Sequence, residues 1–431
     1  MNQPHYVMKK LILLVCLAVV YSASAQQKTA LSEMDVANLK SVMSSTISPD
    51  GSKVAYALGF REDPTKENSG LKIKLYVFDI ASGSSIPFVT QNNMSTVRFR
   101  PNHNSITFTS RRDNDKSTSL YEIPLTGGEA QKIFSFSSSI STYSWHPDGK
   151  QLAFVATVSN KPESSLPYQP EIYEENLRSS NAYLVTISDG EAKQISKDIY
   201  VRQIEWNKDG SKLAYGGAPT ALIDDSYTSQ KIYIVNAGDI SQVSEITHTA
   251  KLGRFAWSPD DKRIAFIGGK DKHDPIAGRL FIADASGGDP TLLNEGFKGS
   301  FDVFTWQDNK NIMFLASEGV DVSLGTMNLS GKINKIIDKS PVAYNGFSLA
   351  SNGTISLTGS TAQHPGELFI KTESAKTPER KTNSNPWLAD RLMGSQEVVT
   401  FKADDGLEIQ GILINPAVPV SGQVPMITVV H

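Results

Sequence analysis

A short motif that recurs seven times along the chain constrains its fold more than any other feature. Two clear copies are YSWHPDGKQLAFVA from Tyr143 and IEWNKDGSKLAYGG from Ile204. One column of the repeat is apolar or aromatic in every copy: Ile47, Phe99, Trp145, Trp206, Trp257, Trp306 and Leu349. Four of the five tryptophans in the chain occupy this column, and successive copies lie 43 to 61 residues apart. This period is typical of the four-stranded blades of a β-propeller.

A second strand-like element follows each copy of the motif. Its central residues are Tyr76, Tyr121, Tyr183, Tyr233, Phe281, Gly325 and Phe369. In a blade, the first column ends the innermost strand, a tight turn of the Pro-Asp-Gly type follows, and the alternating run after it forms the second strand. The second column then marks the third strand. The sequence therefore predicts an all-β fold, a seven-bladed β-propeller within residues 26–383.

The loops between second and third strands vary most in length, and the longest covers about residues 157–181. Because neighbouring strands in a blade run in opposite directions, these loops share one face with the connections between blades. The chain leaves the outermost strand of the last blade on that same face. We therefore expect any segment after the propeller to lie over the variable loops.

The N-terminus has the pattern of a secretory signal peptide. Lys9 and Lys10 precede an apolar run that ends at Val20, and SASA follows, so we expect a signal peptide over residues 1–25 with cleavage after Ala25. The apolar run is too short to span a bilayer. The mature protein is expected to be secreted or periplasmic, with no membrane contact after cleavage.

Composition argues against disulfides, nucleic-acid binding, metals and cofactors. Cys16, the only cysteine, lies in the signal peptide, so the mature chain has no disulfide. The net charge is −3, and the signal peptide holds two of the 42 basic residues and none of the 45 acidic ones, which leaves −5 and no basic block for nucleic acid. No histidines have metal-ligand spacing and no glycine-rich phosphate loop occurs, so we expect no metal and no cofactor. The histidines, among them His146 and His248, are interpreted as solvated surface residues.

The segment after the propeller lacks the repeat. Residues 384–396 are interpreted as a linker. Strand-like runs follow at Val398–Phe401 and Leu407–Ile414, with the turn ADDG between them. The apolar run that ends at His431 is predicted to form a third strand.

The repeats, FTSRRDNDKSTSLYEIPLTGGEAQKI from Phe108, and TFKADDGLEIQGILINP…PMITVVH together resemble the prolyl oligopeptidase family of serine peptidases, in its acylaminoacyl-peptidase and dipeptidyl-peptidase-like branch. The resemblance implies that residues 397–431 begin an incomplete α/β-hydrolase domain. It also implies that His431 begins the loop that gives a backbone N–H to the oxyanion hole. In this family the nucleophilic serine, the aspartate and the histidine all follow that loop.

No Gly-x-Ser-x-Gly occurs in the 431 residues, and Ser348 in the similar GFSLA is interpreted as a structural residue. The resemblance implies a parent protein that releases dipeptides or acylaminoacyl groups from oligopeptides through a serine acyl-enzyme, whereas the chain alone is expected to be inactive. The alternative is a periplasmic binding propeller without catalysis. The segment at residues 397–431 favours the peptidase, because a binding propeller has no use for it. The sequence carries no signature of an oligomeric state.

Two pairs of charged residues are candidates for substrate binding. Glu174 and Glu175 lie in the longest variable loop, and the resemblance implies that such a pair binds the free amino terminus of a peptide, since two carboxylates offer an ammonium group several acceptors. Arg111 and Arg112 are candidates for binding a substrate carbonyl. For all four residues the alternative is a solvated charge on an exposed loop.

Overall fold

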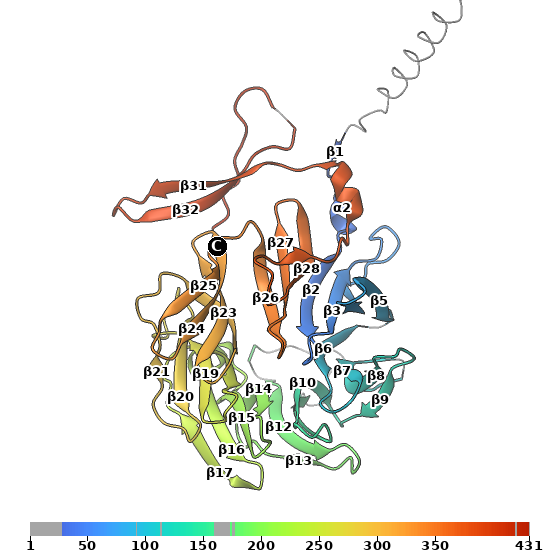
Figure 1. Ribbon diagram of the computed structural model, residues 1–431, viewed down its shortest axis with the longest axis vertical. Coiled ribbons are helices and arrows are strands. Elements are labelled where there is room, and N and C mark those ends of the chain that lie inside the picture. The colour runs from blue at the N-terminus through green and yellow to red at the C-terminus, as the bar shows by residue number, and fades with distance from the viewer. Residues whose placement is uncertain are drawn as a thin grey trace, which may run out of the picture.

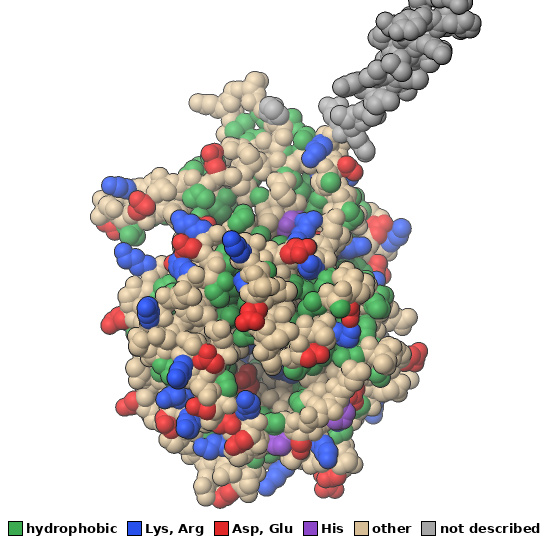
Figure 2. All heavy atoms as spheres, in the orientation of Figure 1, with side chains coloured by type: hydrophobic (Ala, Val, Ile, Leu, Met, Phe, Trp, Pro, Cys, Tyr) green, Lys and Arg blue, Asp and Glu red, His purple; other side chains and the backbone are tan. Residues whose placement is uncertain are grey.

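The computed structural model describes most of the chain. The described residues are 28–91, 93–112, 114–158, 173–174, 177–418 and 420–430. The expected signal peptide, Glu175 and His431 lie outside them. Within the described ranges, no helix is both long and apolar enough to cross a membrane. Acidic and basic side chains are interspersed on the face shown in Figure 2.

Seven four-stranded antiparallel sheets form a β-propeller (Figure 1). In each sheet the strands follow chain order from the innermost to the outermost. The first three blades are β2 Ser41–Ile47, β3 Lys53–Phe60, β4 Lys72–Asp79, β5 Ser84–Val89; β6 Met94–Phe99, β7 Ser105–Ser110, β8 Ser119–Pro124, β9 Gln131–Phe134; and β10 Ser139–Trp145, β11 Gln151–Val158, β12 Ser179–Thr186, β13 Ala192–Gln194. The fourth and fifth are β14 Tyr200–Trp206, β15 Lys212–Ala218, β16 Lys231–Asn236, β17 Asp239–Ile246; and β18 Leu252–Trp257, β19 Arg263–Gly268, β20 Arg279–Asp284, β21 Thr291–Leu292. The last two are β22 Ser300–Trp306, β23 Asn311–Glu318, β24 Asp321–Asn328, β25 Ile333–Ile337; and β26 Ala343–Leu349, β27 Ile355–Thr361, β28 His364–Lys371, β29 Glu379–Arg380. The predicted seven-bladed, all-β fold is confirmed.

The tryptophan column occupies equivalent places in four blades, as predicted. Each tryptophan is the last residue of an innermost strand and is buried. Three of the indole N–H groups donate to the preceding blade: Trp145 to Thr107 Oγ1 at 2.9 Å, Trp257 to the Glu205 carbonyl at 3.3 Å and Trp306 to the Ala256 carbonyl at 3.1 Å. Trp206 packs edge-on against His146 instead, with ring centroids 4.7 Å apart. The tryptophans therefore join blades three to six each to the blade before it.

The second column forms an aromatic stack between the second and third strands. In five blades two aromatic rings lie face to face: Tyr56 on Tyr76, Phe108 on Tyr121, Phe154 on Tyr183, Tyr215 on Tyr233 and Phe266 on Phe281. Blade six has Gly325 at this place, opposite Phe314. A Cβ on Gly325 would lie 2.8 Å from the Phe314 ring, so the glycine makes room for that ring.

The ring closes without exchanging a strand between the first and last blades, because each of them is built from four consecutive strands. Hydrogen bonds cross the seam instead: Ser45 Oγ to Ser356 Oγ at 3.2 Å, and the Ile47 N–H to Ser348 Oγ at 3.2 Å. Ser348 is thus a structural residue, as interpreted from the sequence. A buried apolar cluster shared by both blades, including Val42 and Leu368, completes the closure.

A clasp on the variable-loop face joins the N-terminal segment to the chain that follows the last blade. Here β1 (Thr29–Ala30), which precedes helix α2 (Glu33–Ala37), pairs in parallel with β30 (Arg391–Leu392), which follows the 3₁₀ helix η1 (Pro386–Asp390). We call these four elements the clasp. The amide of Asn385 accepts from the Lys40 N–H at 2.9 Å and donates to the Lys40 carbonyl at 2.7 Å. The segment interpreted as a linker is therefore docked, with Asn385 only 3% exposed.

The predicted hairpin after the linker is present as β31 (Gln396–Lys402) and β32 (Glu408–Ile414). It lies above the β23–β24 turn in Figure 1, where the Val320 N–H donates to Gln410 Oε1 at 3.4 Å. The prediction of a third strand ending at His431 is wrong for its described part, because residues 423–430 are not a strand and Val430 is 92% exposed. No described strand lies beside this run to accept and donate its backbone hydrogen bonds.

Candidate substrate-facing cavity

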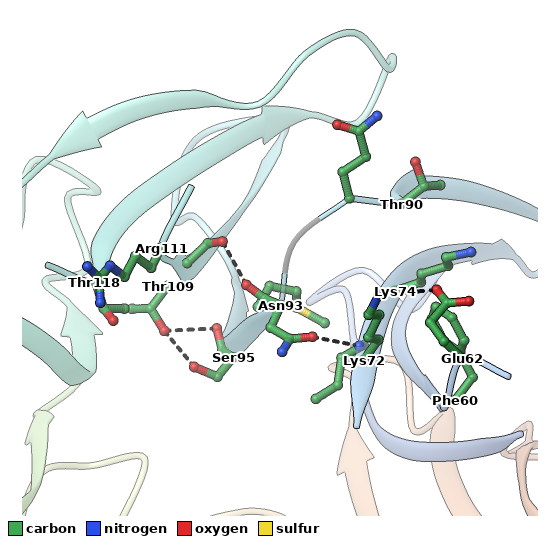
Figure 3. A pocket seen from close by; sticks show the side chains of 14 residues that line it. Phe60, Glu62, Lys72, Lys74, Thr90, Asn93, Ser95, Thr109, Arg111 and Thr118 are labelled. Carbon is green, nitrogen blue, oxygen red and sulfur yellow. Dashed lines mark hydrogen bonds and ion pairs between the residues drawn. The ribbon is translucent and has the colours of Figure 1, made fainter. Parts of the chain in front are cut away.

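A cavity of about 810 Å³ lies between blades one and two (Figure 3). Strand ends on the variable-loop face form its walls: the end of β3, the start of β4, the chain between β5 and β6, and the end of β7. The hairpin of β31 and β32 contacts this same face. The volume is in the range of pockets that bind small molecules and short peptides.

Asn93, just before β6, connects β4 to β7 on one side of the cavity. Its side-chain oxygen accepts from the Ile73 N–H at 3.0 Å, and its side-chain nitrogen donates to the Leu71 carbonyl at 3.3 Å. The Asn93 carbonyl accepts from Ser110 Oγ at 2.7 Å. Next to it, the hydroxyls of Ser95 and Thr109 are 2.8 Å apart. These hydrogen bonds fix blade one against blade two at the cavity.

The charges on the cavity walls are mainly positive. Lys72 is neutralised by two carboxylates, with its Nζ 3.4 Å from Glu62 and 3.7 Å from Glu67. Lys74 Nζ lies 4.4 Å from the centroid of the Phe60 ring, a cation–π contact.

Arg111 stands on the other side of the cavity in Figure 3 and donates from Nε to the Asp115 carbonyl at 3.1 Å. Within the described part of the chain, neither Arg111 nor Lys74 has a carboxylate within 4.0 Å.

Arg112 lines a different, smaller cavity of about 430 Å³. Its guanidinium lies 5.2 Å from the Tyr121 ring centroid and donates to the Ala130 carbonyl at 3.3 Å. Asp115 holds the local backbone by accepting from the Arg112 N–H at 3.1 Å. Burial opposes the ionised form of Asp115, but hydrogen bonds from Lys132 and Tyr121 outweigh it and lower its pKa. The two arginines predicted as one pair therefore line separate cavities.

Glu174 lies in the connection between β11 and β12, a second-to-third-strand loop. It is exposed, with a φ of +63°, and it does not line the cavity between blades one and two. A hydrogen bond to Glu174 and the charge of that residue raise the pKa of the exposed Tyr173. Its partner in the predicted pair, Glu175, is outside the described residues, so the amino-terminus site stays a prediction.

The interpretation of the histidines as solvated is wrong for His248, which is 8% exposed. Its ring packs edge-on against Phe266 and Phe281, with centroids 5.0 and 4.8 Å away, and its Nε2 is 3.2 Å from the Lys251 carbonyl. Burial lowers the pKa of His248. His146 is half-buried against Trp206. A histidine near an aromatic column packs on the rings, because the neutral imidazole is largely apolar.

Of the residues that line this cavity, Arg111 was a candidate from the sequence, whereas Phe60, Lys74 and Asn93 were not. These residues come from separate strand ends in two blades, and no motif or spacing marks them. They meet only because adjacent blades pack side by side.

Similar proteins are known, although no protein-family profile matches the chain. YuxL, an uncharacterized peptidase of Bacillus subtilis, is 24% identical over 250 residues, which are 56% of this chain and 31% of that protein. Dipeptidyl-peptidase 5 of Porphyromonas gingivalis is 28% identical over 202 residues, 44% of this chain and 28% of that protein. The matches therefore span less than a third of the length of each relative.

Solved structures share the fold. An acylaminoacyl peptidase in complex with Z-Gly-Gly-Phe-chloromethyl ketone has a TM-score of 0.70 at 16% identity, over 91% of this chain and 60% of that chain. Acylaminoacyl peptidase of Pyrococcus horikoshii has a TM-score of 0.69 at 16% identity, over 90% and 59%. The β-propeller domain of the Trilobed protease from Pyrococcus furiosus, described as having an open velcro topology, has a TM-score of 0.58 at 15% identity, over 81% of this chain and 99% of that chain.

The fold is thus that of the propellers found in peptidases of the prolyl oligopeptidase type. The predicted resemblance to that family is confirmed, since the sequence relatives are named peptidases and the structural neighbours include acylaminoacyl peptidases and prolyl endopeptidases.

Proposed function

We propose that this chain is the propeller portion of a secreted serine peptidase that hydrolyses short peptides. The observation that carries the proposal is the docked segment after the last blade, which runs through η1 and the clasp into the β31–β32 hairpin. A propeller that only binds a partner needs no such extension. The named peptidases among the relatives support the same class.

The hairpin exposes apolar side chains that a hydrolase domain would cover. Val398, Phe401, Ile412 and Ile414 are each 52–62% exposed. An isolated two-stranded hairpin is at best marginally stable in water, and exposed apolar side chains gathered in one element mark a contact region. The strand register puts Val398, Ile412 and Ile414 on one face of the hairpin and Phe401 on the other. We propose that these residues pack on the peptidase domain of the parent protein, and that His431 begins its oxyanion loop.

In the proposed reaction, a serine outside these 431 residues attacks the peptide carbonyl and forms an acyl-enzyme, which water then hydrolyses. The propeller contributes binding and restricts access. Glu174 and Glu175 are proposed to accept hydrogen bonds from the ammonium group of the substrate. The chain alone contains no Gly-x-Ser-x-Gly, so we propose that it does not hydrolyse peptides.

A fluorophosphonate probe, which labels activated serines, tests this proposal. The 431-residue chain should stay unlabelled and should not cleave aminoacyl, dipeptidyl or acylaminoacyl chromogenic substrates above the buffer rate. The parent protein, extended through its own downstream residues, should gain both labelling and cleavage. Stoichiometric labelling of the short chain would show that it already contains a nucleophile. An extended protein that is inert on all three substrate classes would favour the binding propeller.

A further inference from the structure

We propose that the cavity between blades one and two binds a carboxylate of a peptide through Lys74 or Arg111, the two cations on opposite sides of the cavity (Figure 3). The proposal rests on the proposed function in one respect, namely that the ligand is a peptide. It adds a charge preference, at a cavity that Glu174 does not line.

The first argument is the distribution of charge. Three cationic side chains and one carboxylate, Glu62, line the cavity. Lys72 is already paired with Glu62 and Glu67. Lys74 and Arg111 have no carboxylate partner among the described residues, so an anion in the cavity can reach two positive charges that no described carboxylate offsets.

The second argument is the geometry of the two cations. The Phe60 ring lies 4.4 Å from Lys74 Nζ and holds the ammonium by its face, which leaves N–H groups directed elsewhere. The Arg111 Nε–H is fixed on the Asp115 carbonyl at 3.1 Å. Its terminal nitrogens have no hydrogen bond with any described residue. A guanidinium anchored in this way is oriented for a bidentate contact with a carboxylate.

The third argument is the remainder of the lining. Ser95, Thr109 and Thr118 contribute hydroxyls, and Asn93 holds the two blades at a fixed distance. Hydroxyl groups can donate to peptide carbonyls or carboxylates without adding charge. The cavity therefore combines cationic contacts with neutral donors in a volume suited to a short peptide.

Binding of fluorescently labelled tetrapeptides to the intact 431-residue chain, measured by anisotropy at low salt, tests the proposal without any catalysis. Three peptides separate the sources of the carboxylate: tetra-alanine with a free C-terminus, its C-terminal amide, and an amide with glutamate at the third position. At least one carboxylate peptide should bind about tenfold more tightly than the neutral amide, because a charge-assisted hydrogen bond contributes roughly one decade of affinity. The free acid or the glutamate peptide, whichever binds best, identifies the source.

Either Lys74→Gln or Arg111→Gln, whichever removes the cation that contacts the carboxylate, should weaken carboxylate binding about fivefold to tenfold, and neither should change binding of the neutral amide. Lys272→Gln removes an exposed lysine in blade five and should change neither. Unchanged melting temperatures will show that the variants are folded. The proposal is overturned if no peptide binds, if the neutral amide binds as tightly as both acids, if both variants keep wild-type affinity, or if equimolar inorganic phosphate displaces the peptide. Probe labelling of the extended protein is a separate readout, so the carboxylate site and the peptidase assignment can fail independently.

Discussion

Gly149 shows how strongly one residue is constrained where neighbouring blades meet. In the turn after β10 it has a φ of +71°, and a Cβ there would lie 2.1 Å from the Pro101 carbonyl oxygen in blade two. Gly149→Ala should therefore carry two costs, about 1–2 kcal/mol for the left-handed backbone and about 1–3 kcal/mol for the clash. The free energy of unfolding from urea titrations measures the sum.

Gly190→Ala is the matched control, because Gly190 has a φ of +70° but no atom within 4 Å of the added Cβ. It should lose only the backbone part, about 1–2 kcal/mol. Equal losses for both variants would show that the contact between the two turns does not constrain this position.

His248 makes stability depend on pH. Burial lowers its pKa below the ordinary value of 6.5, so the unfolded chain takes up a proton at a pH where the folded chain does not. Because of His248, the free energy of unfolding therefore decreases as pH falls through 6.5. Above that pH the contribution of His248 to the free energy of unfolding is constant. His248→Gln should reduce the loss of unfolding free energy between pH 7.5 and 5.5.

His273→Gln is the control, since it removes a histidine from an exposed loop and not from the core. If His248→Gln and wild type show the same change between the two pH values, His248 does not carry this dependence.

At the scale of elements, one ion pair links the two halves of the clasp. Arg391 Nε and one terminal nitrogen each donate to the Asp35 carboxylate at 2.9 Å, and Asp35 also completes a capping box with Ser32 at the start of α2. The hydrogen bond from Arg391 is the main cause of the lowered pKa of Asp35. The pair should therefore persist as pH falls to the ordinary pKa of an aspartate and be lost only below it.

Arg391→Gln should loosen the clasp while the blades keep their packing. We expect faster hydrogen–deuterium exchange in residues 29–37 and 386–402 and an unchanged melting temperature of the propeller. Arg380→Gln, an exposed arginine on β29 without an ion pair among the described residues, should alter neither. Exchange rates in Arg391→Gln equal to those of wild type would mean that β1–β30 pairing alone holds the clasp.

Elements were predictable from the sequence where a local pattern and a neighbouring strand agree. The blades satisfy both conditions, since a turn and an alternating run place each second strand beside the first. The hairpin does as well, with ADDG between its strands. Ile427 to Val430 has the apolar pattern of a strand but no described partner, and it is exposed. The two-residue strands β1 and β30 are too short to carry any pattern, because tertiary contact alone selects them.

At the scale of the whole molecule, the sequence predicted the fold better than the candidate site. Each of the seven copies of the repeat predicts a blade independently, so the fold is still predicted although one copy has Gly325 in place of an aromatic residue. The cavity has no such repetition in the sequence. Its lining residues Phe60, Lys74, Asn93 and Arg111 belong to separate strand ends of two blades. Their proximity follows from the packing of blade one against blade two, and no spacing along the chain encodes that packing.

The burial pattern of the whole molecule also indicates which C-terminal residues the propeller needs for its stability. Each blade buries its own apolar residues against the next, whereas the hairpin and the residues after it are mostly exposed. A chain that ends at Ser395 keeps the clasp, and it should melt at the temperature of the full chain and bind less of an apolar dye such as ANS. A chain that ends at Lys381 also loses Asn385 and Leu388, which are 3% and 7% exposed. Burial of a leucine contributes roughly 1.5–3 kcal/mol, and the Lys40 backbone loses both its partners, so this chain should melt several degrees lower. Equal melting temperatures for the two truncated chains would show that the clasp adds nothing to the ring, whereas early melting of the chain that ends at Ser395 would make the hairpin part of the propeller core.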